Sequence, residues 1–160
     1  MKDIFIVLGN QLFDPLYLKN YKDCKIFMAE DLGLCTYEKH HKLKILHFLS
    51  SMRSYNDLLK SKGFETDYYD CKNDFSNKYE DKLKKSIKEN KSKRVFSFEV
   101  EDKHFEKKLN KIVKEIGLER VIVTSPMFLN SRDDFKKYLC LLYTSPSPRD
   151  RTRSRMPSSA

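Results

Sequence analysis

The residues best suited to chemistry lie just after a short apolar segment that ends near Met28. Two acidic side chains, Glu30 and Asp31, come first, and the basic, imidazole-rich run T-Y-E-K-H-H-K-L-K-I follows over residues 36–45. Carboxylates accept hydrogen bonds, whereas lysine donates them and histidine can do either and also titrates. Polar chemistry and the start of an amphipathic helix therefore meet in one place, which is where we expect function to lie.

The histidines in this run do not predict a metal site. His40 and His41 are adjacent, so on a helix they point about 100° apart and cannot act as an i, i+4 pair. The four cysteines, Cys24, Cys35, Cys71 and Cys140, lack the spacing of a zinc site. We expect reduced thiols, no metal, a hydrogen-bonded core role for His41 on the apolar face, and a helix-edge position for His40.

Several common catalytic and nucleotide-binding motifs are absent from the sequence. There is no G-x-G-x-x-G, no G-x-x-x-x-G-K-[ST] and no G-x-S-x-G, so dinucleotide, P-loop and hydrolase interpretations lack their central feature. A receiver domain would need paired acids after its first strand, where this chain has Gly9-Asn10-Gln11. We therefore name no catalytic residue.

Length and charge indicate one soluble domain. The 160 residues carry a formal charge of +9, but the lysines alternate with acids, as in K-Y-E-D-K-L-K-K-S-I-K-E-N-K. That pattern favours solvated helix faces over a phosphate-binding patch. No apolar run approaches a membrane span, and the N-terminus lacks the features of a signal peptide. We expect a cytoplasmic, monomeric protein without membrane contact.

Alternating strand and helix patterns predict the elements that position these residues. Apolar runs predict strands at 3–8, 25–28, 65–69, 94–98 and 120–124. The longest helix is predicted over 37–62, with Thr36 as N-cap and Gly63 at its C-terminal end. Its apolar face comprises Tyr37, His41, Ile45, Phe48, Met52, Tyr55 and Leu59. Further helices are predicted over 79–89 and 105–116 and from near Ser131, with a polar loop over 70–77.

This alternation predicts an α/β fold, a five-stranded parallel sheet with helices on both faces that is flavodoxin/Rossmann-like. Ligands of such sheets bind beyond the carboxyl ends of the strands, where the strand order reverses. Three of the five predicted strand ends are acidic, at 30–31, 70–71 and 99–101. A site built there should disfavour a bare polyphosphate.

The last twenty residues have a different composition. Residues 141–160 contain four arginines, no lysine and three prolines, whereas the preceding residues contain 24 lysines, four arginines and two prolines. The segment resembles the translated read-through of a sequencing-library adapter. We expect a domain over 1–139, a disordered, non-native tail over 141–160, and a parent protein that continues beyond about Leu139. An RNA-binding Arg/Ser arm is the alternative that composition permits.

Several sequence blocks together resemble one protein family. These are L-G-N-Q-L-F at 8–13, M-A-E-D at 28–31, T-Y-E-K-H-H-K-L-K-I at 36–45, F-L-S-S-M-R at 48–53 and F-L-N-S-R-D-D-F at 128–135. In this order they resemble the N-terminal domain of the deoxyribodipyrimidine photolyase-related proteins, the iron–sulfur bacterial cryptochromes and photolyases. The resemblance covers residues 1–139 and implies an antenna domain of a flavoprotein for light-dependent DNA repair or blue-light sensing.

The resemblance also implies cofactors and partners. In complete members a helical C-terminal domain holds FAD and a 4Fe-4S cluster and contacts DNA, while the N-terminal domain holds a ribityl-lumazine antenna. For this antenna we expect close backbone approach at Gly9, amide contacts from Asn10 and Gln11, acceptance of ribityl hydroxyls by Glu30, and ring walls from Tyr37 and Ile45. The alternative is a free-standing flavodoxin-like module that binds a nucleotide or a partner protein.

Overall fold

A computed structural model describes residues 2–36, 38–74 and 77–144 of the chain. The chain divides into two compact units, residues 1–126 and 127–160. The first unit holds the sheet and all residues discussed below as a site. In the second unit the described structure includes helix α6 (Arg132–Thr144). No helix in the described ranges is long and apolar enough to cross a membrane.

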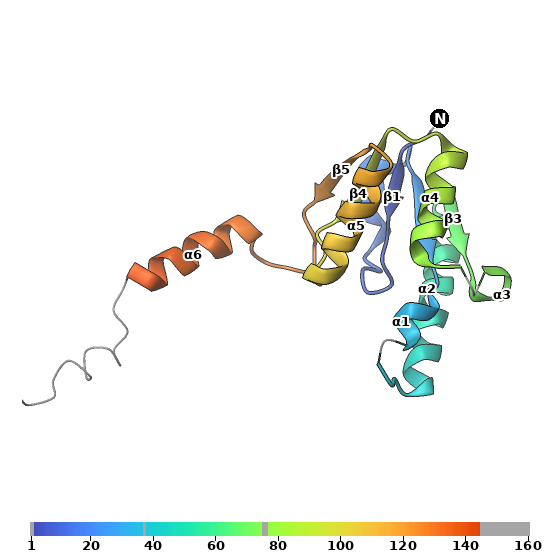
Figure 1. Ribbon diagram of the computed structural model, residues 1–160, viewed down its shortest axis with the longest axis horizontal. Helices are drawn as coiled ribbons and strands as arrows, with labels where there is room; N and C mark the ends of the chain where they lie inside the picture. Colours follow the sequence, from blue (N-terminus) through green and yellow to red (C-terminus); the bar gives the residue numbers. More distant parts are fainter. Residues whose placement is uncertain (1, 37, 75–76, 145–160) are drawn as a thin grey trace, which may run out of the picture. The chain divides into compact units, whose positions relative to one another are not determined.

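Five parallel strands form the centre of the first unit (Figure 1). Their order is β3 (Thr66–Tyr69), β2 (Lys25–Ala29), β1 (Ile4–Ile6), β4 (Arg94–Phe98) and β5 (Glu119–Val123). The chain moves outward from β1 to β3 and then crosses to β4 on the other side of β1. The strand order therefore reverses between β1 and β4, and the predicted parallel α/β architecture is confirmed.

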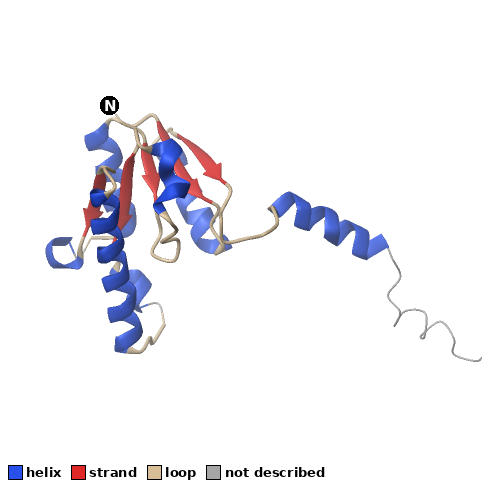
Figure 2. Ribbon diagram, turned by 180° about the vertical axis from the view of Figure 1, so that it is seen from behind, coloured by secondary structure: helices blue, strands red, loops and turns tan. Residues whose placement is uncertain are grey.

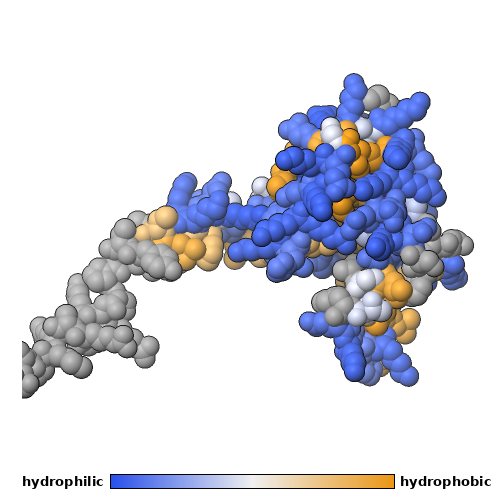
Figure 3. Space-filling view, in the orientation of Figure 1, coloured by the Kyte–Doolittle hydropathy of each residue, from blue (hydrophilic) through white to orange (hydrophobic). Residues whose placement is uncertain are grey.

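Helices cover both faces of this sheet because each face is apolar. One face packs against α4 (Tyr79–Asn90) and α5 (Lys103–Glu115), whose buried residues join those of the strands in a single core. The side that Figure 3 presents, over these two helices, is mostly hydrophilic, as the interleaved lysines predict. Asp102 begins α5 by accepting hydrogen bonds from the backbone N–H groups of His104 and Phe105, at 2.7 and 3.3 Å.

The opposite face packs against a 3-10 helix, η1 (Pro15–Tyr21), and against α2 (Lys42–Ser61), the longest helix (Figure 2). Met52, Tyr55 and Leu59 of α2 are buried in this core, whereas Ile45 and Phe48 are only half-buried. In Figures 1 and 2 the first turns of α2 run past the end of the sheet, which explains why its apolar face is not covered there.

The helix predicted over 37–62 corresponds to α2 and begins five residues later than expected. A short helix, α1 (Leu32–Thr36), follows β2, and α2 starts only at Lys42. Thr36 is therefore not the N-cap of α2, because it ends α1 and its hydroxyl donates to the Leu32 carbonyl at 2.9 Å. Gly63, predicted to end the long helix, has a φ of +82°, a left-handed conformation that glycine adopts without strain.

Two other boundaries differ from the sequence prediction. The segment predicted as a polar loop over 70–77 contains a one-turn helix, α3 (Cys71–Asp74). Helix α6 ends at Thr144, so it includes the first four residues of the arginine-rich segment 141–160 and extends past residue 139, the predicted end of the domain. The remainder of the predicted tail, residues 145–160, lies outside the described residues.

Candidate functional site

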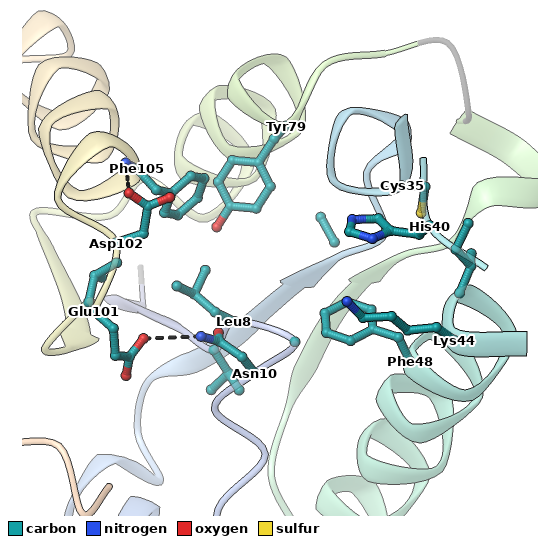
Figure 4. A pocket seen from close by; sticks show the side chains of 15 residues that line it. Leu8, Asn10, Cys35, His40, Lys44, Phe48, Tyr79, Glu101, Asp102 and Phe105 are labelled. Carbon is teal, nitrogen blue, oxygen red and sulfur yellow. Dashed lines mark hydrogen bonds between the residues drawn. The ribbon is translucent and has the colours of Figure 1, made fainter. Parts of the chain in front are cut away.

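A cavity of about 330 Å³ opens at the carboxyl ends of the strands, next to the reversal between β1 and β4 (Figure 4). The segments that follow β1 and β4 form one side of it, and α1, α2 and the loop between them form another. The first residue of α4 and the first turn of α5 complete the wall. Its lining residues are Val7, Leu8, Gly9, Asn10, Ala29, Cys35, His40, Lys44, Ile45, Phe48, Tyr79, Val100, Glu101, Asp102 and Phe105.

Two amide side chains fix a carboxylate on the strand side of the cavity. Asn10 Nδ2 donates to Glu101 Oε2 at 3.0 Å (Figure 4), and Gln11 Nε2 donates to Glu101 Oε1 at 3.3 Å. Gln11 Nε2 also donates to the carbonyl of Glu99 at 2.7 Å. These bonds join the end of β1 to the end of β4 and present Glu101 to the cavity as a preoriented acceptor.

The helical side of the cavity carries the opposite charge. Lys44 of α2 and His40 of the preceding loop face Glu101 and Asp102 across the space in Figure 4. Ile45 and Phe48, also on α2, add apolar surface to the lining. The cavity thus combines apolar walls with hydrogen-bonding groups at two sides, the usual composition of a small-molecule site.

Gly9 lets α2 approach the end of β1. A Cβ added at Gly9 would collide with the Phe48 ring and would lie 2.8 Å from Met52 Sδ. The missing side chain is therefore needed first for packing of this helix, which places Phe48 at the cavity wall.

Glu30 is a buried carboxylate that pairs with the half-exposed Arg53, and it does not line the cavity. Its carboxylate is fully buried and binds Arg53 through two hydrogen bonds, at 2.6 and 2.8 Å. The Tyr68 hydroxyl and the Cys71 backbone N–H donate to the same carboxylate, at 2.5 and 2.9 Å. Burial alone would raise the pKa of Glu30, but these donors outweigh it and lower the pKa to about 2.

The predicted site residues therefore have different fates in the structure. Gly9, Asn10 and Ile45 line the cavity. Gln11 is fully buried behind the lining and acts on it through Glu101. Glu30 is committed to Arg53, and Tyr37 lies outside the described residues.

The burial of the two histidines is the reverse of the prediction. His41 is exposed and is the N-cap of α2, because its Nδ1 accepts a hydrogen bond from the Leu43 N–H at 3.2 Å. The prediction of a core histidine was wrong, since the helix begins one residue later than the histidine pair. His40, predicted at the helix edge, is half-buried and lines the cavity.

The thiols and acids of the described residues do not point to a metal site. Cys24, Cys35 and Cys71 are outside any disulfide. Burial, followed by the hydrogen bond and charge of Glu30, raises the pKa of Cys71 to about 12, so its thiol keeps the proton at neutral pH. Within the described ranges, no group of three or more histidine, cysteine, aspartate or glutamate residues could hold a metal.

Sequence reasoning did not select Tyr79, Glu101 or Lys44 as site residues. Glu101 was noted only as part of an acidic strand end, and Tyr79 only as part of a thin apolar stripe. A usable signal existed for both, because Glu101 lies three residues after the end of β4 and Tyr79 is the first residue of the helix that precedes β4. Both positions therefore lie beside the reversal of the sheet.

Comparison with known proteins agrees with the sequence resemblance. The sequence model of the deoxyribodipyrimidine photo-lyase-related protein family matches residues 5–140. The chain belongs to this family. The match begins in β1 and ends in α6, so it includes the sheet except for Ile4, together with every residue that lines the cavity. No curated protein matches the chain.

Proposed function

We propose that this photolyase-related chain is an antenna-chromophore domain and that its cavity binds a ribityl-lumazine. The cavity itself is the main support, because its position at the strand reversal, its volume of about 330 Å³ and its mixed walls suit a bicyclic ring with a polyol tail. A ribityl-lumazine would absorb light, while the protein would supply apolar contacts and fixed hydrogen-bonding groups.

Three sets of side chains would hold the ligand. Ile45 and Phe48 would pack on the ring, and Glu101, oriented by Asn10 and Gln11, would accept hydrogen bonds from hydroxyl groups. Lys44 would donate to an acceptor at the other side. The acids at the rim disfavour a nucleotide, because phosphate charges would lie near Glu101 and Asp102.

In this proposal the catalytic or signalling step belongs to a further domain. FAD, a 4Fe-4S cluster and DNA contacts would be found there, and the whole protein would act in light-dependent DNA repair or in blue-light sensing. Genomic sequence beyond codon 139 tests this directly. A reading frame without a helical flavin domain and clustered cysteines would contradict it.

Fluorescence titration of the purified full chain with ribityl-lumazine tests the site. Ile45→Trp should abolish binding, because the indole would fill the cavity. Leu46→Trp is the matched control, since Leu46 is adjacent on α2, is 64% exposed and does not line the cavity. It should bind like the unaltered chain.

Two results would refute the assignment. One is the absence of saturable binding to the unaltered chain. The other is equal binding by both tryptophan variants, which would place the ligand elsewhere. Binding of ATP without binding of lumazine would support the nucleotide-binding alternative.

A further inference from the structure

Tyr79 is a buried tyrosine at the inner wall of the cavity. It is the first residue of α4, is 3% exposed, and packs edge-on against Phe27 and Phe105 with ring centroids 5.7 and 5.4 Å away. In Figure 4 its hydroxyl points toward Leu8, inside the set of cavity-lining side chains. The phenol therefore presents its polar end to the cavity and its ring to the core.

The hydroxyl has no hydrogen-bond partner among the described residues. A buried hydroxyl without an acceptor costs free energy, and such groups in folded proteins generally have a partner. Burial raises the pKa of Tyr79, and the charge of Asp31 raises it further, so the group keeps its proton and remains a donor.

Packing alone does not explain a tyrosine at this position. Phenylalanine would provide the same ring contacts with Phe27 and Phe105 without an unpaired hydroxyl. The contrast with Tyr68 is informative, because Tyr68 is half-buried against the core on the other face of the sheet and its hydroxyl donates to Glu30 at 2.5 Å. At Tyr79 the acceptor must come from what enters the cavity.

We infer that Tyr79 donates a hydrogen bond to a ring carbonyl of the cavity's ligand, which is therefore a planar, uncharged heteroaromatic compound. An anionic acceptor is disfavoured beside this hydroxyl, because Asp31 raises its pKa more than Arg120 lowers it and because Glu101 and Asp102 line the same cavity, whereas Lys44 lies on the opposite wall. Flat apolar walls at Phe48 and Phe105 favour an aromatic ring. The inference rests on the proposed function for the location of the site and adds the residue that binds the carbonyl edge of the ligand's ring.

Two probes and two variants of the full chain test this inference. The probes are ribityl-lumazine and lumichrome, which shares a ring-dione edge with lumazine but has no ribityl chain. Tyr79→Phe removes only the hydroxyl and should weaken binding of both probes about tenfold. Its urea midpoint should equal or exceed that of the unaltered chain, because an unpaired buried group has been removed.

Tyr68→Phe is the matched control. It should leave the affinity for both probes unchanged, because Tyr68 does not line the cavity, and it should lower the urea midpoint. A purely structural role for Tyr79 would give the same pattern as Tyr68→Phe, so affinity and stability together separate the two roles.

The outcomes separate the role of Tyr79 from the antenna function proposed for the cavity. If Tyr79→Phe binds both probes as tightly as the unaltered chain, the inference is wrong and the hydroxyl bonds only to water. If lumichrome binds in a Tyr79-dependent manner and ribityl-lumazine does not bind, the inference holds and the antenna proposal fails. If neither probe binds the unaltered chain, both are overturned.

Discussion

Replacing Glu30 with glutamine should destabilise the protein and remove part of its acid sensitivity. The carboxylate is fully buried, and its pKa falls from an ordinary 4.5 to about 2, which corresponds to about 3 kcal/mol in favour of the charged form. The Arg53 side chain is 45% exposed, so water screens part of this interaction. We therefore expect a loss of about 2 kcal/mol at neutral pH.

The pH dependence follows from the same two pKa values. Because the folded-state pKa lies below that of the unfolded chain, the unfolded chain binds the proton first as the pH falls. The contribution of Glu30 is complete above about pH 5 and is lost between about pH 5 and pH 2. Urea unfolding of both proteins at pH 7 and pH 3 should show their free energies of unfolding converging at the lower pH.

A double substitution and an exposed control pair test whether the loss comes from the Glu30–Arg53 interaction. Arg53→Met should be more harmful than Glu30→Gln, since it leaves a buried carboxylate without its cation, and adding Glu30→Gln to it should restore stability. Glu65→Gln removes the exposed partner of Lys2 and should cause no measurable change. Equal urea midpoints for the unaltered chain and Glu30→Gln at pH 7 would refute the reasoning.

Two further substitutions test how α2 is held. His41→Ala should lower the free energy of unfolding in urea by about 1 kcal/mol, because the Leu43 N–H loses its acceptor. His41→Asp should retain the cap. Equal losses in both variants would show that the cap does not contribute to stability. Gly9→Ala should cost about 1–3 kcal/mol through the collision with Phe48, and Phe48→Leu in the same chain should recover part of the loss. An unaffected thermal midpoint for Gly9→Ala would show that α2 can shift away.

The centre of the sheet was predictable because β1, β2 and β4 are buried on both faces. Apolar or nearly apolar runs such as I-F-I and V-F-S-F are typical of such strands. The start of α2 was harder to predict, because the helical spacing in the sequence already begins at Tyr37 and His41, whereas α2 begins at Lys42. An exposed histidine used as a cap has no periodicity that would distinguish it from a core residue.

The candidate site was predictable in location and only partly in composition. The position of Gly9 and Asn10 at the cavity follows from topology alone, and their contact with a ligand stays a prediction. The sequence does not show that Arg53 lies within hydrogen-bonding distance of Glu30, so this ion pair could not be predicted. Strand-end logic missed Tyr79, because an unpaired hydroxyl is a property of the packed core and leaves no mark in the residue pattern.

The contacts of Glu30 also bear on how the domain folds. Its side chain and carbonyl join β2 to Arg53, Tyr68, Cys71 and Lys82, which are 23, 38, 41 and 52 residues further along the chain. Closing such loops costs chain entropy before the contacts can repay it. A nascent chain that has not yet formed α4 therefore cannot complete this network, and its formation belongs to the cooperative assembly of the sheet rather than to any local segment.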